Sequence, residues 1–130
     1  LLIPRKRDEK NPKRDPIFIM DSYLKDGKSL IFFPEGSRGK AGKIQVFKKG
    51  LGYLMKENMN IPIIPVYLEG IGRVLPKGNK IMLPGITKIY FGNPIFLENE
   101  SVEEIVEKAE NAVHYLKNRC DNNNSSKLRD

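Results

Sequence analysis

The chain has little of the chemistry that metal and redox sites require. Among its 130 residues it contains one cysteine, Cys120, and one histidine, His114. A single cysteine cannot form an internal disulfide, and one thiol does not make a metal site. With one imidazole, a histidine-based metal cluster is also excluded. The sequence therefore favours a reducing compartment and a site that works without a metal.

Long apolar runs are also missing. None approaches the length of about 20 residues that a helix needs to cross a bilayer, and no secretory signal peptide is visible. We therefore expect no transmembrane segment in this chain. Its first residues are Leu1-Leu2-Ile3, without an initiating methionine. This start leads us to expect a fragment whose N-terminal part is missing.

Basic residues are abundant, and they are unevenly placed. Hydrophobic residues make up 39% and charged residues 30% of the chain, a composition typical of one globular domain. The net charge is +7. Residues 1–50 hold 13 Lys and Arg against 6 Asp and Glu, whereas residues 51–130 hold 10 of each. A basic half implies an anionic partner, which is a phosphate, a nucleic acid or an acidic membrane surface.

Apolar strand-like runs alternate with helical patterns, which predicts an α/β fold with a mixed, partly parallel sheet flanked by helices. Asp15 and Pro16 predict a helix start, and Gly27 its end. Ser101 and Glu104 predict a capping box before a C-terminal helix. We expect a disordered polar tail over 120–130. The expected strands cover 1–3, 29–33, 61–68 and 87–91, and a further helix covers 48–58.

The hexapeptide Phe33-Pro34-Glu35-Gly36-Ser37-Arg38 follows the expected strand at 29–33. It places a carboxylate, a glycine, a hydroxyl and a guanidinium at the carboxyl end of a strand, where α/β folds usually place their sites. Arg38 offers two parallel donors that suit a phosphate, and we interpret Glu35 as its orienting partner. The hexapeptide alone is equally compatible with a turn that carries a surface ion pair.

Two further segments make the pattern more specific. Phe47-Lys48-Lys49-Gly50 follows the hexapeptide, and Ile61-Pro62-Ile63-Ile64-Pro65-Val66 comes next. In order and spacing, the chain resembles the glycerolipid acyltransferase family, the lysophosphatidic acid acyltransferase-like enzymes (1-acylglycerol-3-phosphate O-acyltransferases). Residues 3–7 resemble the family's second motif, although Lys6 stands where the family often has an acid. The resemblance covers most of residues 1–97 and implies that 1–119 form the C-terminal part of the acyltransferase domain.

The resemblance implies transfer of a fatty acyl group to a lysophosphatidic acid-type glycerol phosphate in phospholipid synthesis. The donor would be acyl-CoA or acyl carrier protein, with no further cofactor. The phosphate and glycerol of the acceptor would be bound by Arg7, Glu35, Gly36, Ser37 and Arg38. The resemblance also implies a membrane-associated protein at the cytoplasmic face, on an anionic membrane surface.

One departure from the family concerns catalysis. The family's catalytic motif is a histidine followed five positions later by an aspartate, the first acting as general base and the second orienting it. Here His114 is followed five positions later by Arg119, on the expected C-terminal helix. We therefore expect no catalytic residue in this chain, and we expect the chain as given to be inactive.

The sequence leaves two alternative roles open for several basic residues. Lys48 and Lys49 either hold an anion or are solvated, and Arg73 and Lys77 either line the donor's phosphates or belong to a mobile loop. A non-catalytic basic module that binds an anionic membrane or nucleic acid would also explain the basic half. Few aromatic residues accompany the basic run and no nucleic-acid reader motif is present, so we expect no nucleic-acid partner.

Overall fold

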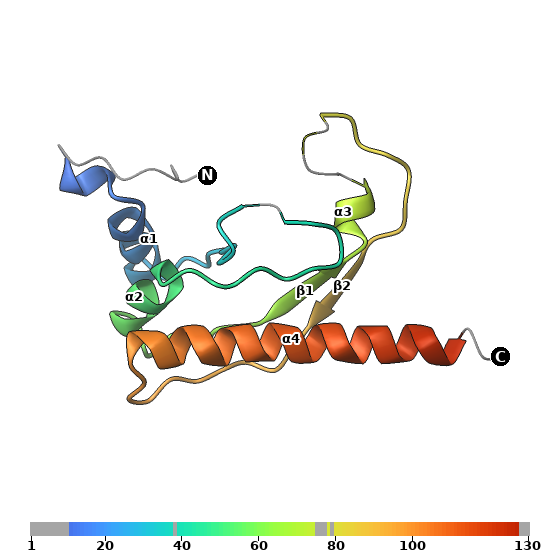
Figure 1. Cartoon of the computed structure of the whole chain (residues 1–130). Helices are drawn as coiled ribbons and strands as arrows, with labels where there is room; N and C mark the ends of the chain where they lie inside the picture. Colours follow the sequence, from blue (N-terminus) through green and yellow to red (C-terminus); the bar gives the residue numbers. More distant parts are fainter. Residues whose placement is uncertain (1–10, 38, 75–77, 79, 128–130) are drawn as a thin grey trace.

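The computed structural model describes residues 11–37, 39–74, 78 and 80–127. The expected strand at 1–3 lies outside these residues. A long C-terminal helix runs along one side of the molecule, with α2 against its first turns and the two strands further along (Figure 1). The elements, in chain order, are η1 (Pro12–Arg14), α1 (Pro16–Lys25), α2 (Gly50–Lys56), β1 (Val66–Glu69), α3 (Ile71–Val74), β2 (Lys88–Phe91) and α4 (Val102–Lys127).

Helix α1 begins and ends where the sequence predicts. The Asp15 carboxylate accepts the backbone N–H of Ile17 at 2.8 Å, and Pro16 occupies the first helical position. Such a cap satisfies one of the free N–H groups at a helix start. Gly27 has φ +76°, a left-handed conformation that terminates helices and favours glycine. Both ends of α1 are therefore fixed by local sequence.

The sheet differs from the prediction. In the described part of the chain it consists of β1 and β2 alone, paired antiparallel from Val66 opposite Phe91 to Glu69 opposite Lys88. The helices and the small sheet agree with an α/β class, but the parallel pairing that we expected is not found there. Pro62 and Pro65 lack the N–H that a ladder needs, so the strand expected from 61 starts only at Val66.

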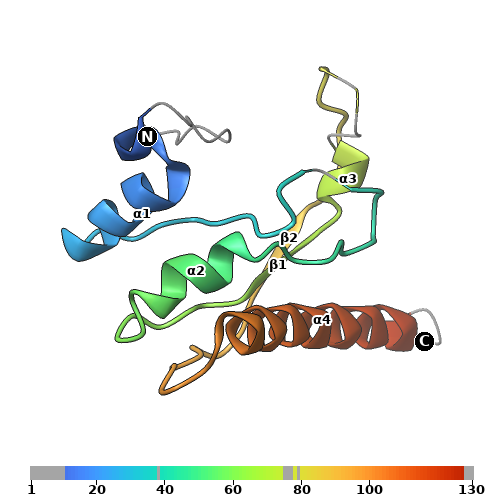
Figure 2. The same ribbon diagram turned by 60° about the vertical axis from the view of Figure 1, so that its left-hand side comes forward.

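The strand expected at 29–33 does not form either. Leu30 and Phe32 pack against the core, whereas the side chains of Ile31 and Phe33 are 89% and 69% exposed. This alternation is typical of a strand, yet no described strand pairs with the segment, which crosses from α1 to the next loop as an unpaired connection (Figure 2). A strand needs a neighbour, and none of the residues that the structure describes supplies one.

The core lies between α2 and α4. Leu51, Leu54 and Met55 of α2 are buried, as predicted, against Ile105 and Ala109 of α4. The two backbones approach closely at Gly52, where a Cβ atom would lie 2.4 Å from the carbonyl oxygen of Val102. Glycine is therefore required at this crossing.

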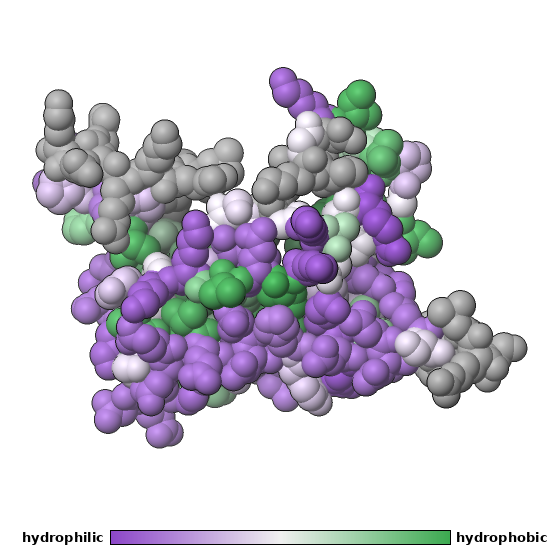
Figure 3. Space-filling model, viewed as in Figure 1, coloured by the Kyte–Doolittle hydropathy of each residue, from purple (hydrophilic) through white to green (hydrophobic). Residues whose placement is uncertain are grey.

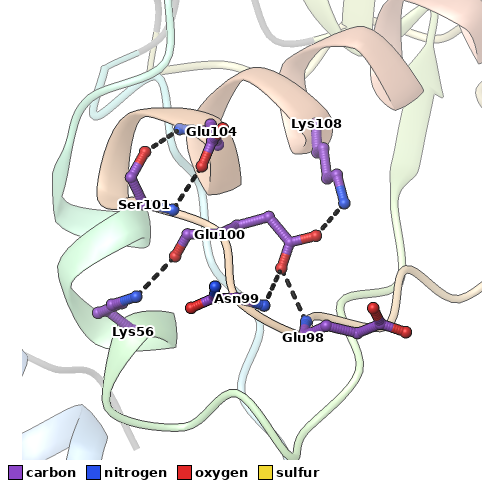
Figure 4. Close-up of polar contacts among 7 residues, drawn as sticks. All are labelled: Lys56, Glu98, Asn99, Glu100, Ser101, Glu104 and Lys108. Carbon is purple, nitrogen blue, oxygen red and sulfur yellow. Dashed lines mark hydrogen bonds and ion pairs between the residues drawn. The ribbon is translucent and has the colours of Figure 1, made fainter.

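A polar network holds the start of α4 (Figure 4). The Ser101 hydroxyl accepts the N–H of Glu104, and the Glu104 carboxylate accepts the N–H of Ser101 at 2.7 Å, which confirms the capping box. Glu100 forms an ion pair with Lys108, and this contact lowers the pKa of the Glu100 carboxyl to about 2. The Lys56 ammonium donates to the Glu100 carbonyl oxygen at 2.8 Å and thereby ties α2 to this cap.

The end of α4 also differs from the prediction. Residues 120–127, expected as part of a disordered tail, continue the helix to Lys127. Lys117 and Asp121 form an ion pair one turn apart at 2.6 Å, and the Asn124 amide donates to the Glu69 carboxylate of β1 at 2.7 Å. These contacts, which composition does not reveal, stabilise a polar helix end. The expected domain boundary at 119 stays a prediction.

Candidate functional site

The first four residues of the hexapeptide, 33–36, form a tight turn. The N–H of Gly36 donates to the carbonyl oxygen of Phe33 at 3.1 Å, with Pro34 at the second position of the turn. Proline suits this position because its φ is already fixed near the required value. Gly36 has φ +72°, which other residues rarely adopt. The sequence of the motif therefore determines its backbone shape.

Glu35 closes the loop that follows the turn. Its carboxylate accepts the backbone N–H of Gln45 at 2.8 Å, and the Ser37 hydroxyl donates to the Gln45 side-chain oxygen at 3.4 Å. The two limbs of the loop are thus held together by two of the predicted site residues. Arg7 and Arg38 lie outside the described residues, so the pairing of Glu35 with Arg38 stays a prediction.

Lys48 lies across the turn. Its backbone N–H donates to the Pro34 carbonyl oxygen at 2.9 Å. A Cβ atom on Gly36 would lie 3.0 Å from Cε and 3.1 Å from Nζ of Lys48, so the side chain occupies the space that glycine leaves open. Within the described part of the chain, Lys48 makes no ion pair. The structure therefore brings a free cation next to Gly36.

Lys49 behaves differently from its neighbour. Its ammonium forms an ion pair with Glu103 of α4 at 2.8 Å, and this contact raises the pKa of Lys49. The sequence left both lysines with two interpretations. The structure separates them, because Lys49 joins the loop to α4 whereas Lys48 faces the turn.

Glu110 is a residue that the sequence analysis missed. Its carboxylate accepts the backbone N–H of Phe47 at 2.7 Å, and the Phe47 side chain is buried. The contact fixes the end of the loop on α4, directly before Lys48. The available signal was slight: Glu110 borders the apolar stripe of α4, where a carboxylate needs a partner.

The charges around the turn favour an anion. Residues 36–56 contain no Asp or Glu. A phosphate in this region would therefore meet the positive charge of the segment, while the carboxylate of the adjoining Glu35 is occupied by the backbone N–H of Gln45. The basic residues of the segment are Arg38, Lys40, Lys43, Lys48, Lys49 and Lys56.

Two other polar regions are less suited to a phosphate. A depression beside the start of α4 is lined by four glutamates and one lysine, which would repel an anion. Between the sheet and α4, Glu69 accepts the Tyr90 hydroxyl at 3.2 Å beside the buried Cys120, and burial raises the pKa of that thiol. These groups bind one another and hold β1, β2 and α4 together.

Two further findings concern the described residues as a whole. No group of three or more potential metal-binding side chains occurs among them. None of the helices in the same part of the chain is long and apolar enough to cross a membrane.

Comparison with known proteins gives one consistent result. A family model described as Acyltransferase matches residues 2–69. The chain is 31% identical over 96 residues to 1-acyl-sn-glycerol-3-phosphate acyltransferase BAT2, chloroplastic, from Brassica napus, covering 73% of this chain and 28% of that protein. It is 32% identical over 95 residues to 1-acyl-sn-glycerol-3-phosphate acyltransferase LPAT1, chloroplastic, from Arabidopsis thaliana, covering 72% of this chain and 26% of that protein.

A bacterial relative gives a similar match. The 1-acyl-sn-glycerol-3-phosphate acyltransferase of Pseudomonas aeruginosa is 29% identical over 96 residues, covering 74% of this chain and 37% of that protein. The chain therefore spans well under half the length of each of these relatives. No solved structure matches the chain.

Proposed function

Because the chain belongs to the acyltransferase family, we propose that it forms the acceptor-binding part of an enzyme that acylates a 1-acylglycerol 3-phosphate in phospholipid synthesis. The observation that carries this proposal is the turn at Gly36 with the free ammonium of Lys48 across it. The curated relatives are named for the acceptor that such a site would fit.

The acceptor's phosphate would bind at this turn. A dianion needs fixed cations and N–H or O–H donors near it. Lys48 supplies an ammonium, and Ser37 a hydroxyl, both next to Gly36. Arg38 and Arg7 would complete the set of cations, with Arg38 binding two phosphate oxygens at once. Glu35 would act indirectly, since its carboxylate holds Gln45 and so keeps the loop closed.

The reaction needs a base that this chain lacks. In acyl transfer, the acceptor's hydroxyl oxygen attacks the thioester carbonyl carbon, the carbon–sulfur bond breaks, and the thiol leaves. A general base takes the hydroxyl proton. The single histidine, His114, lies on α4 with Arg119 five positions later. We propose that the chain alone binds the acceptor without turning it over, whether the donor is acyl-CoA or acyl carrier protein, and that no cofactor takes part.

We also propose that the protein works on an anionic membrane surface at the cytoplasmic face. Both the acceptor and the product of the proposed reaction are lipids with anionic head groups. A basic surface concentrates near such a membrane, with each Lys or Arg contributing about 1 kcal/mol when it lies close to the head groups. The surplus of basic residues in the first 50 positions supports this proposal.

Calorimetric titration tests the acceptor site. The purified chain would be titrated with a short-chain 1-acylglycerol 3-phosphate below its micelle concentration, and in parallel with the monoacylglycerol of the same chain length. We expect binding of the first lipid only, because the phosphate is the recognised group. Equal affinity for both lipids would contradict a phosphate site at the turn.

A thioester-release assay tests the missing base. The chain, acyl-CoA and the same acceptor should give only the background rate. Turnover well above background would show that the histidine–aspartate motif is dispensable, while leaving the binding result unaffected.

A further inference from the structure

The loop between α3 and β2 presents apolar side chains to solvent. Ile81, Met82 and Ile86 are 74%, 68% and 80% exposed, and Leu83 is 47% exposed. In both ribbon views the described residues from 80 to the start of β2 extend beyond the helices and strands (Figures 1 and 2), and hydrophobic residues, in green, lie along this segment in Figure 3. Single exposed apolar residues are common on protein surfaces, but a contiguous group indicates an interaction site. We call residues 80–86 the apolar loop.

The base of the apolar loop is firmly held. The N–H of Leu83 donates to the carbonyl oxygen of Val74 at 2.8 Å, and Val74 is buried. A Cβ atom on Gly85 would lie 2.9 Å from a methyl group of Val74, and one on Gly70 would lie 2.5 Å from the Ile86 carbonyl oxygen. The chain is thus closely packed where it leaves and rejoins the body. The backbone that carries the exposed apolar side chains is therefore held in place by contacts with Gly70 and Val74.

Basic residues lie within the apolar loop and in the segments beside its base. Residues 70–97 contain no Asp or Glu. The acid-free segment 36–56 lies alongside, since a Cβ atom on Gly72 of α3 would lie 2.8 Å from Cα of Ala41. Lys88 pairs with Glu69 of the adjacent strand. The exposed cations Lys40, Lys43, Arg73 and Lys80, in contrast, make no ion pair with any residue that the structure describes.

We propose that the apolar loop inserts into the head-group region of an anionic lipid bilayer, while Lys40, Lys43, Arg73 and Lys80 contact the lipid phosphates. Apolar side chains bordered by lysine and arginine are the combination that binds such a surface. A second copy of the chain would bring the same positive charge against this face and would be repelled. The proposal rests on the anionic membrane surface given under the proposed function and deepens it by naming the segment that inserts, and it requires neither the acceptor site nor turnover.

A vesicle-pelleting assay with the full chain tests the insertion. The vesicles would contain phosphatidylcholine alone, or phosphatidylcholine with roughly one-third phosphatidylglycerol, and no lysophosphatidic acid. We expect binding to the anionic vesicles, weakened at least about ten-fold by the double substitution Ile81→Asp with Met82→Asp. The matched control is Phe91→Asp with Phe96→Asp, because these side chains are 71% and 70% exposed and receive the same two charges. The control should bind like the parent.

A fluorescence measurement makes the result independent of the double substitutions. The chain has no tryptophan, so Met82→Trp and Phe96→Trp each introduce a single reporter. On anionic vesicles, the Met82→Trp emission should shift to the blue and be quenched by bromine-labelled lipid tails. The Phe96→Trp emission should not change. Circular dichroism of every variant confirms that the helices are retained.

Three results would overturn the proposal. One is equal vesicle binding by the parent and the Ile81→Asp, Met82→Asp variant. Another is an equal loss in the Phe91→Asp, Phe96→Asp control, which would indicate unspecific adsorption through any exposed apolar group. The third is a lower oligomeric mass of the Ile81→Asp, Met82→Asp variant than of the parent by light scattering, with unchanged vesicle binding. This result would assign the apolar loop to contacts with a second copy of the chain.

Discussion

The carboxylate of Glu110 accepts the backbone N–H of Phe47 at 2.7 Å, across 63 positions of sequence. Phe47 is buried, and the next residue is the lysine that lies over Gly36. Glu110 of α4 therefore holds the backbone directly before Lys48, the proposed phosphate-binding cation. The position of Lys48 depends on α4 as well as on its own loop.

Removing this contact should cost stability. Glu110→Ala leaves the Phe47 N–H without its acceptor, and loss of a hydrogen bond to a charged group costs about 1.5–3 kcal/mol. Glu110→Gln keeps an acceptor oxygen and should cost less. Urea unfolding measures both, with Glu107→Ala, an exposed neighbour on the same helix, as the control. A free energy of unfolding in Glu110→Ala equal to that of the control would show that the contact does not stabilise the loop.

The two adjacent lysines should differ in acceptor binding. Lys48→Met removes the ammonium next to Gly36 and should weaken binding of the 1-acylglycerol 3-phosphate about 10- to 100-fold, as expected for one charge-assisted contact. Lys49→Met removes the same charge from a residue that is paired with Glu103, and it should change the affinity much less. Calorimetric titration gives both constants. Equal losses would mean that only net charge matters and would remove Lys48 from the site.

Two glycines of α2 should respond in opposite directions to alanine. In Gly52→Ala the new methyl group meets the Val102 carbonyl oxygen, and separating α2 from α4 should cost about 1–3 kcal/mol. In Gly50→Ala the methyl group would lie 3.7 Å from Ile17 and 3.8 Å from Phe32, an ordinary contact. The better helix propensity of alanine should then stabilise the chain by about 0.5–1 kcal/mol. Thermal unfolding distinguishes the pair, and a stabilised Gly52→Ala would contradict the close crossing.

Acid should weaken the cap of α4 through Glu100. Lys108 lowers the pKa of this carboxyl from 4.5 to about 2 in the folded chain. A carboxyl with a lowered folded-state pKa contributes stability above its unfolded-state pKa, and that contribution is lost as the pH falls from about 4.5 to about 2. Glu100→Gln should therefore flatten the dependence of stability on pH within this window.

Circular dichroism melts at a series of pH values measure the Glu100 effect. Glu107→Gln, which removes a nearby carboxylate on α4, is the matched control. Salt should reduce the difference, because the contact is near the surface. If the Glu100→Gln and parent curves stay parallel across the window, the ion pair with Lys108 does not contribute to folding.

Local signals predicted the starts of α1 and α4 correctly, whereas the helix expected over 48–58 spans only Gly50–Lys56. Asp15 caps α1 and Ser101 caps α4 through bonds to residues two and three positions away, so the sequence alone contains both partners. The strand at 29–33 was predicted wrongly for the opposite reason. It was predicted from an apolar run, but a ladder needs a second segment, and pairing depends on contacts far along the chain. The helical end of α4 was missed because its support, Glu69, lies 55 positions from Asn124.

The candidate site was predictable in part. The motif indicated a turn at Pro34 and a role for Gly36, since proline and glycine act on their own backbone. It could not distinguish Lys48 from Lys49, because the difference between them is the presence of Glu103 on α4. The contact between the Glu35 carboxylate and the backbone N–H of Gln45 could not be predicted from the motif either, since the two residues meet only after the loop has folded back.

The order of α2 and α4 along the sequence has a consequence for synthesis. Its residues complete the core around α2, hold Phe47 and support β1, and all of them follow residue 101 in the sequence. During translation, the α2 core and the loop that carries Lys48 cannot close until α4 has left the ribosome. Contacts between distant positions also slow folding in general. Until α4 is available, the apolar side chains of α2 have no partner to cover them, and exposed segments of this kind are the ones that chaperones at the ribosome exit bind.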